Sequence, residues 1–216
     1  MTQTGLDLRD LRIMHRGNQI AALNTTVPAG EVLVVMGPSG SGKSTLLSAI
    51  IGSPPAGFDV SGNIILNGRD VTHVPTAQRR IGILFQDDVL FPHLSVGQNL
   101  GFGLAANAGN RSQRRTLIDQ ALADADLAGF AHRDPATLSG GQRARVALMR
   151  TLLAKPQALL LDEPFSRLDL ALRDQIRQFV LDRARAERLP VILVTHDPAD
   201  ATASGGRIIF PDGSTP

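Results

Sequence analysis

The chain has 216 residues, of which 43% are hydrophobic, and this length suits one domain with a substantial core. Its net charge of +2 gives no reason to expect a nucleic-acid partner, and its lack of cysteine excludes disulfides and thiolate metal sites. No apolar run approaches the roughly 20 residues that span a bilayer, and residues 1–10 lack the apolar core of a signal peptide, so we expect a soluble, cytoplasmic protein.

The first part of the chain predicts a small antiparallel sheet. Leu6–Ile13 and Ile20–Val27 alternate apolar and polar residues, which favours two short strands. Ser61–Leu66 reads as a further strand, and Asn67 and Gly68 after it form a hairpin turn signal. Together these stretches indicate a side sheet near the N-terminus.

The residues between Val32 and Ile51 predict a strand, a loop and a helix, in that order. Val32–Met36 is an apolar run, Lys43–Ile51 has a helical pattern, and the loop between them fits the phosphate-binding pattern G-x-x-x-x-G-K-[ST]. An accidental match has a chance of roughly one percent at average residue usage, so we set it aside. The residues expected to contact a nucleotide here are Gly37, Pro38, Ser39, Gly40, Ser41, Gly42, Lys43, Ser44 and Thr45.

Each residue type in this loop suits a triphosphate. The glycines let backbone N–H groups point inward at the positive end of the helix, where they form an anion-binding nest. Lys43 would reach the β- and γ-phosphates of ATP, and the Ser44 hydroxyl would ligate the accompanying Mg²⁺. Lys43 and Lys155 are the only lysines among 22 basic residues, so a compact cation stands where the loop needs one.

Arg80–Phe85 is a mostly apolar stretch that predicts another strand, and Gln86 follows it. A glutamine at the carboxyl end of a strand suits contact with Mg²⁺ and with an attacking water. An ordinary polar loop residue would look the same, and the residue taken alone does not separate these interpretations.

Leu138–Gln142 is followed by a helical pattern over Arg143–Ala154. Its serine and glycines provide backbone donors at a helix start, which makes a second anion site from Ser139, Gly140, Gly141 and Gln142. This stretch resembles the signature sequence of ATP-binding cassette (ABC) ATPases. The phosphate loop, Gln86 and the later motifs stand in the order of that family, so the resemblance covers nearly the whole chain.

Ala158–Glu163 is an apolar run that ends in two carboxylates, and it predicts a buried parallel strand. Asp162 would hold Mg²⁺, directly or through water. Glu163 would accept a proton from the water that attacks the γ-phosphate, or would orient that water. The alternative is a helix cap before Pro164, but a carboxylate pair at a strand end in a chain with a phosphate loop favours catalysis.

Three further stretches follow. Ser166–Asp169 lies where the ABC family has its D-loop, with Arg167 at a position that is usually small. Leu170–Arg188 is helical, and Pro190–Thr195 predicts a last core strand before a short one at Arg207–Phe210. His196 matches the switch histidine of the family, whose resemblance implies contact with the γ-phosphate; a structural histidine is the alternative.

The resemblance also implies a fold. We expect an α/β protein with a P-loop NTPase core and a mostly parallel sheet, an N-terminal antiparallel β subdomain, and an inserted helical subdomain that carries the signature. All 216 residues would form one ABC ATPase domain, with a nucleotide-binding core at residues 1–86 and 156–216 and the helical subdomain at residues 87–155. Many family members stack an aromatic residue on adenine, and Met14 and His15 are the nearest candidates here.

The partners follow from the same resemblance. Leu90–Asn99 and Arg133–Pro135 are similar to bacterial importer ATPases of the thiamine, ferric iron and polyamine classes, whose helical subdomain receives a segment of a membrane permease. The alternative is that Leu90, Phe91 and Leu94 are simply core. Arg111, Arg114 and Arg115 read as a solvated helix face.

We therefore expect an ATP-hydrolysing subunit that powers solute import, peripheral on the inner face of the cell membrane. It would work as a homodimer or with a paired ATPase subunit, alongside a permease and a substrate-binding protein. The alternatives are an ABC ATPase without a permease, in DNA repair, translation or cluster assembly, and a non-catalytic nucleotide-binding regulator. A phosphate-loop kinase would not need the signature.

Overall fold

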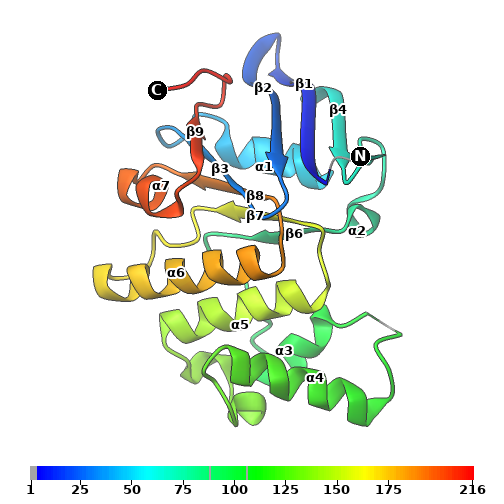
Figure 1. Cartoon of the computed structure of the whole chain (residues 1–216), viewed down its shortest axis with the longest axis vertical. Helices are drawn as coiled ribbons and strands as arrows, with labels where there is room; N and C mark the ends of the chain where they lie inside the picture. Colours follow the sequence, from blue (N-terminus) through cyan, green and yellow to red (C-terminus); the bar gives the residue numbers. More distant parts are fainter. Residues whose placement is uncertain (1–3, 88, 106) are drawn as a thin grey trace. The chain divides into compact units, whose positions relative to one another are not determined.

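The computed structural model describes residues 4–87, 89–105 and 107–216 (Figure 1). The chain divides into two compact units. The first comprises the residues up to 83 together with 157–163 and 181–216, and the second comprises 84–156 and 164–180. No described helix is long and apolar enough to cross a membrane.

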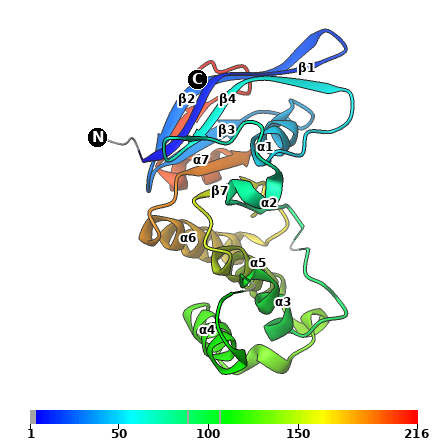
Figure 2. The same ribbon diagram turned by 90° about the vertical axis from the view of Figure 1, so that its right-hand side faces the viewer.

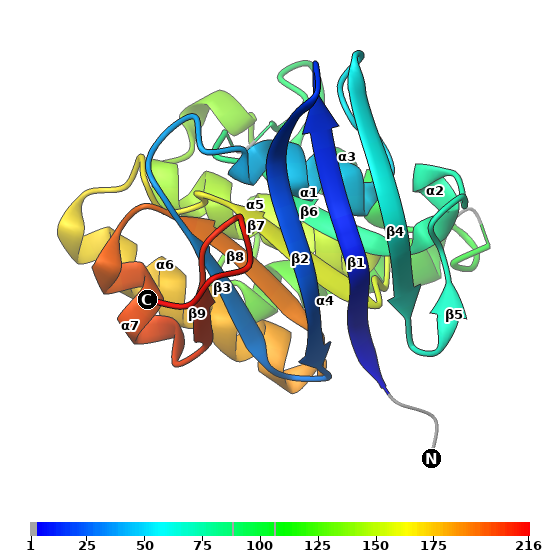
Figure 3. The same ribbon diagram turned by 90° about the horizontal axis from the view of Figure 1, so that it is seen from above.

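The first unit contains a four-stranded antiparallel sheet in the order β2-β1-β4-β5 (Figure 3). Its strands are β1 (Gly5–His15), β2 (Asn18–Pro28), β4 (Phe58–Leu66) and β5 (Arg69–Asp70). The strands β1, β2 and β4 are longer than the sequence predicted, because backbone pairing continues to the β1–β2 turn, where His15 faces both Asn18 and Phe58.

A register shift within β1 keeps the apolar side chains of this strand on its buried face. Leu6 and Leu8 are buried, and so are Leu11 and Ile13, although strict alternation would put the second pair on the opposite face. The register with β2 shifts between Leu8 and Leu11, so the change in phase returns the second pair to the buried side.

A second sheet has five strands in the order β6-β7-β8-β3-β9. These strands are β3 (Val32–Met36), β6 (Ile81–Leu84), β7 (Ala158–Asp162), β8 (Val191–Thr195) and β9 (Arg207–Ile209). β3 runs parallel to β8 and β9, and β7 runs parallel to β8. The central strands are apolar runs that are buried almost throughout, as expected for parallel strands covered on both faces. The predicted α/β fold with a mostly parallel sheet is confirmed.

The helix that follows the phosphate loop is α1 (Lys43–Ile51), and it lies between the two sheets of the first unit (Figures 2 and 3). Leu46, Leu47 and Ile50 of this helix are fully buried in one cluster with residues of both sheets. At about 25 cal/mol per Å² of apolar surface, three such side chains contribute several kcal/mol, which fixes the helix and the loop before it.

Arg79 binds carbonyl groups at the C-terminal end of α1. It ends the short helix α2 (Thr76–Arg79), and its buried guanidinium donates hydrogen bonds to the carbonyls of Ile50 at 2.8 Å and Ala49 at 3.3 Å. Burial lowers the pKa of Arg79. The bond to Ile50 satisfies a carbonyl that a helix C-terminus leaves without an intrahelical partner, and a cation is favourable at that end of the helix dipole.

The second unit is largely helical (Figure 2). It contains α3 (Val96–Gly103), α4 (Arg111–Asp124), α5 (Gly140–Leu153) and the part of α6 (Leu170–Ala186) up to Val180. Their apolar faces meet in a core that includes Val96, Leu100, Leu122 and Val146. Two single turns of 3₁₀ helix, Phe130–His132 and Pro135–Thr137, connect α4 to α5. Of the predicted solvated arginines, Arg114 is half-buried and donates to the carbonyls of Gly101 and Ala105.

Each of α3, α4 and α5 begins with a capping box, in which the N-cap side chain and the third helical residue bond to each other's backbone N–H. The pairs are Ser95 with Gln98, Asn110 with Gln113, and Ser139 with Gln142. The cap at Ser139 starts α5 at Gly140, whereas the sequence pattern predicted the helical run from Arg143.

The remaining helix is α7 (Pro198–Ser204), in the first unit. Asp197 is its N-cap and accepts a hydrogen bond from the backbone N–H of Ala199 at 2.8 Å. The cap therefore fixes the direction in which the chain leaves β8.

Candidate functional site

The phosphate loop runs from the end of β3 to the start of α1. Gly40 and Gly42 have φ values of 80° and 89°, in the left-handed region that favours glycine. A Cβ on Gly42 would come within 2.4 Å of a side-chain carbon of Ile20, so β2 approaches the loop closely there. No side-chain cap closes the start of α1 among the described residues, which leaves its first N–H groups available to an anion.

Ser41 supplies direct support for a ligand in this loop. Its hydroxyl is buried and has no hydrogen-bond partner among the described residues. A buried polar atom without a hydrogen-bond partner destabilises the folded protein, so its presence in a native structure needs an explanation, such as a ligand that supplies the partner. A phosphate oxygen seated in the loop would provide the missing partner.

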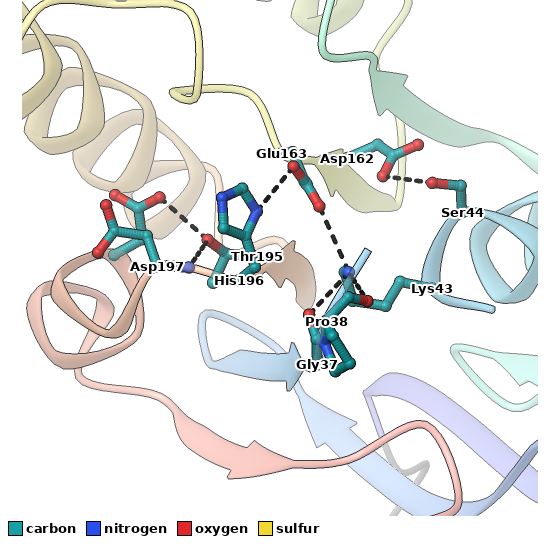
Figure 4. Close-up of polar contacts among 10 residues, drawn as sticks. Gly37, Pro38, Lys43, Ser44, Asp162, Glu163, Thr195, His196 and Asp197 are labelled. Carbon is teal, nitrogen blue, oxygen red and sulfur yellow. Dashed lines mark hydrogen bonds and ion pairs between the residues drawn. The ribbon is translucent and has the colours of Figure 1, made fainter. Parts of the chain in front are cut away.

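Lys43 lies at the centre of the loop, with only 4% of its surface exposed. Its ammonium donates to the carbonyls of Gly37 at 2.8 Å and Pro38 at 2.9 Å (Figure 4). It also lies 3.4 Å from a carboxylate oxygen of Glu163, at the end of β7. A buried cation beside free helix N–H groups makes the loop strongly favourable for negative charge.

Asp162 and Ser44 bring oxygen atoms together beside the loop. The Ser44 hydroxyl donates to Asp162 at 3.0 Å (Figure 4). Burial raises the pKa of Asp162 and the neighbouring carboxylate of Glu163 raises it further, while the Ser44 hydrogen bond and Lys43 act in the opposite direction. A hydroxyl and a carboxylate are the hard oxygen donors that Mg²⁺ prefers.

The described residues contain no group of three or more His, Asp or Glu side chains that would hold a metal ion by themselves. Ser44 and Asp162 therefore fit an Mg²⁺ ion that takes its other ligands from phosphate oxygens and water, as this ion does in nucleotide sites.

Glu163 connects the loop to His196. One carboxylate oxygen lies near Lys43, and the other lies 3.0 Å from His196 Nδ1 (Figure 4). The backbone φ of Glu163 is 46°, and a non-glycine residue in that region stores strain that functional sites often carry. Its carboxylate is 16% exposed while the His196 imidazole is 50% exposed, so the acid is sheltered and the histidine faces solvent. This carboxylate can accept a proton from water.

The first unit thus brings together the predicted residues Gly37–Thr45, Asp162, Glu163 and His196. Gln86 and Ser139–Gln142 belong to the second unit. Gln86 is exposed just after β6, and the Ser139 and Gln142 side chains bond each other's backbone N–H at 3.3 and 3.0 Å. A Cβ on Gly141 would meet Leu172 at 2.6 Å, so that glycine also serves packing.

Two side-chain contacts of the first unit carry little sequence signal. His15 stacks on Phe58 with ring centroids 4.3 Å apart, and its Nδ1 lies 3.0 Å from the carbonyl of Gly57. Thr195 and Asp200 form a buried hydrogen bond next to His196. Phe58 and Asp200 stand out only after the register of β4 and the start of α7 are known.

The second unit contains a cavity of about 380 Å³. Its wall combines apolar, polar and charged side chains, among them Gln86, Val89, Leu90, Arg143, Arg167 and Leu168. Arg167 forms an ion pair with Asp87, which also lines the cavity. The exposed rings and side chains of Phe85, Val89 and Phe102 belong to the same unit.

Comparisons with known proteins identify the family of the chain. Residues 20–166 match the ABC transporter family. The chain is similar to an uncharacterized ABC transporter ATP-binding protein, YnjD, of Escherichia coli strain K12, with 55% identity over 181 residues that cover 84% of this chain and 83% of that protein. It is 41% identical to the thiamine import ATP-binding protein ThiQ of Chelativorans sp. over 207 residues, which cover 95% of this chain and 82% of that protein. It is 40% identical to the Fe(3+) ions import ATP-binding protein FbpC of Escherichia coli O157:H7 over 187 residues, which cover 87% of this chain and 53% of that protein.

Proposed function

The chain belongs to the ABC transporter family as an ATP-binding subunit, and we propose that it hydrolyses ATP at the loop of α1 to drive solute import through a membrane permease. The single observation that carries the chemistry is the placement of Glu163 between Lys43 and His196. A carboxylate between a buried cation and an imidazole, beside a phosphate loop, is an arrangement for phosphoryl transfer to water.

The loop residues bind the triphosphate in this proposal. The backbone N–H groups of the loop residues other than Pro38, together with the Lys43 ammonium, face the β- and γ-phosphates, and the Ser41 hydroxyl gains the partner that it lacks. The Lys43 ammonium then exchanges contacts with loop carbonyls for contacts with phosphate oxygens, which bear the greater negative charge.

Glu163 is the proposed catalytic base. Its carboxylate orients the attacking water and accepts a proton from it, while His196 contacts the γ-phosphate from the other side of Glu163. Ser44 and Asp162 are the residues of the first unit that would hold Mg²⁺, which when bound would neutralise charge on the phosphates. Gln86, in the second unit, stays a predicted Mg²⁺ ligand.

The proposed active assembly is a dimer, either of two copies or with a paired ATPase subunit. The signature residues Ser139, Gly140, Gly141 and Gln142 open α5 and would face the nucleotide on the phosphate loop of the partner copy. Their place in a unit other than that of the phosphate loop supports this arrangement. One nucleotide-binding domain with a helical subdomain at residues 87–155 is part of the same proposal.

The permease is the proposed membrane partner, with a substrate-binding protein in the same system. The cavity of the second unit and the neighbouring Phe102, which is 67% exposed, suit a short apolar segment of that partner. In this proposal the chain lies on the inner face of the cell membrane and is held there by the permease.

The test uses the tagged chain expressed in cells and purified from solubilised membranes. We expect an integral membrane protein to co-purify with it and the complex to hydrolyse ATP. Glu163→Gln should lower hydrolysis by at least about 100-fold and retain bound ATP in a stable dimer. The exposed residue Glu187 provides the matched control, and Glu187→Gln should leave hydrolysis unchanged. An active chain that never associates with a membrane protein would contradict the transport role.

A further inference from the structure

Thr195 and Asp200 form a buried polar pair beside His196. Thr195 is the last residue of β8 and is 2% exposed, while Asp200 lies in α7 and is 3% exposed. The Thr195 hydroxyl donates to a carboxylate oxygen of Asp200 at 3.1 Å. Polar groups this deeply buried destabilise a protein unless they are hydrogen-bonded, so the bond defines how the chain is arranged here.

The same hydroxyl also bonds the backbone of the residue that follows His196. It accepts a hydrogen bond from the backbone N–H of Asp197 at 3.0 Å (Figure 4). A threonine hydroxyl has one proton and two lone pairs, and the proton goes to Asp200. Asp200 therefore turns the lone pairs of Thr195 toward the N–H of Asp197, and the two bonds fix the backbone on both sides of His196.

The imidazole itself has less restraint than its backbone. Half of the His196 side chain is exposed, so packing restrains the ring only in part. Its Nδ1 nevertheless lies 3.0 Å from Glu163, at hydrogen-bond distance. The position of the backbone between Thr195 and Asp197 therefore determines where the ring meets Glu163.

We propose that Thr195 and Asp200 are positioning residues for ATP hydrolysis, because their hydrogen bonds hold His196 in place against Glu163. This inference rests on the proposed role of His196 in hydrolysis. A purely structural role, in which the pair only joins β8 to α7, is the competing account. The two accounts differ in whether loss of the pair matters once the imidazole has gone.

The test compares Thr195→Val with Thr195→Ser, each made alone and together with His196→Ala, in the ATPase complex purified from membranes. Valine has a similar shape but lacks the hydroxyl, whereas serine keeps it. Steady-state hydrolysis gives kcat and the KM for ATP, and single-turnover hydrolysis of radiolabelled ATP follows the slow variants. Thermal unfolding of each variant measures the structural cost separately.

We expect Thr195→Val to lower kcat on the order of 10- to 100-fold, as for a misplaced catalytic group, with KM changed by less than about twofold. Thr195→Ser should keep kcat within about twofold of the original chain. In the His196→Ala background, Thr195→Val should change kcat by less than about twofold, because the group that it positions is absent.

An equal loss of kcat from Thr195→Val in both backgrounds would overturn the positioning role. So would an unchanged kcat in Thr195→Val when His196→Ala is itself defective. If His196→Ala keeps full activity, the proposed role of His196 fails, and the inference falls with it.

Asp200 gives a second test should Thr195→Val not fold. Asp200→Asn keeps an oxygen that can accept a hydrogen bond from the Thr195 hydroxyl, whereas Asp200→Ala removes that oxygen. We expect Asp200→Ala to lower kcat at least about tenfold below that of Asp200→Asn. Equal kcat in the two variants would overturn the inference.

Discussion

The helices α1 and α5 both have glycines in or just before their first turn, but these first turns are closed in different ways. The N-cap of α1 is Gly42, so no side chain caps this helix among the described residues, and the unpartnered hydroxyl of Ser41 lies next to it in the chain. The N-cap of α5 is Ser139, and the side chains of Ser139 and Gln142 form a complete capping box. An uncapped helix start needs a ligand to satisfy its N–H groups, whereas a capped one is stable without it.

This difference implies unequal roles for the two loops. The loop before α1 combines free N–H groups with the buried Lys43, so it supplies most of the affinity for phosphate in our proposal. At the start of α5 the N–H groups of Ser139 and Gln142 are already engaged in the capping box, and in our proposal this loop acts on a nucleotide presented by another copy. The following experiments test that division, from the largest expected effect to the smallest.

Loss of the buried cation should have the largest effect. Lys43→Met removes the ammonium from the loop, and we expect the affinity for ATP to fall about 100-fold, because a charge-assisted bond to phosphate is worth roughly 3 kcal/mol. Calorimetric titration with ATP and Mg²⁺ measures the dissociation constant for ATP. Lys155→Met is the matched control, since Lys155 is the other lysine and is exposed. An equal loss in both variants would contradict the role of the loop.

Adding a side chain at Gly42, the uncapped N-cap of α1, should have the second largest effect. Gly42→Ala would place a Cβ within 2.4 Å of Ile20 at a φ of 89°, and we expect a loss of about 1–3 kcal/mol in the free energy of unfolding with about tenfold weaker ATP binding. Gly17→Ala has a similar φ of 81° with nothing within 4 Å, so it should destabilise less and leave ATP affinity unchanged. Urea unfolding and ATP titration give both values. Weaker ATP binding in Gly17→Ala as well would show that strain alone explains the effect.

The capped helix allows structure and function to be separated. Ser139→Ala and Ser95→Ala each remove an N-cap with the same 3.3 Å bond, and each should cost about 1 kcal/mol of stability. Only Ser139→Ala should lower ATP hydrolysis, by about tenfold, because only α5 carries the signature. Chemical unfolding and steady-state hydrolysis compare them. Equal hydrolysis in the two variants would leave Ser139 with a structural role alone.

The smallest effect concerns the charge of Asp162. Burial raises its pKa, so the ionised carboxylate is less favourable in the folded chain than in the unfolded one, and stability is lower above the raised pKa. Asp162→Asn should therefore raise the melting temperature near pH 7 by a small amount, and this gain should disappear as the pH falls through the raised pKa toward 3.8.

Asp70 is the control of opposite sign. Hydrogen bonds from Thr72 lower the pKa of Asp70, so its ionised form stabilises the fold above 3.8, and that contribution is lost as the pH falls through the lowered pKa. Asp70→Asn should lower the melting temperature near neutral pH. Calorimetric scans across this pH range measure both variants, and changes of the same sign would contradict the assignment.

The sequence predicted the elements of the catalytic end well because their signals are local. The bounds of β3 and α1 agree with the prediction, and a buried strand does end in Asp162, with Glu163 directly after it. The glycines and lysine of the phosphate loop and the apolar runs of the strands are patterns of a few neighbouring residues, so they can be recognised without knowledge of the fold. Strand ends were less accurate, because β1, β2 and β4 continue for as long as a neighbour pairs with them.

By itself the sequence determined the phosphate loop, the order of the motifs, the α/β class and the family resemblance, since each depends on residues close together in the chain. Only the tertiary structure decided that Glu163 lies between Lys43 and His196, that Asp200 bonds Thr195, and that His15 stacks on Phe58. These contacts join side chains from different strands and helices, or from either side of a turn. Their geometry depends on sheet register, helix caps and burial, which no local pattern of residues encodes.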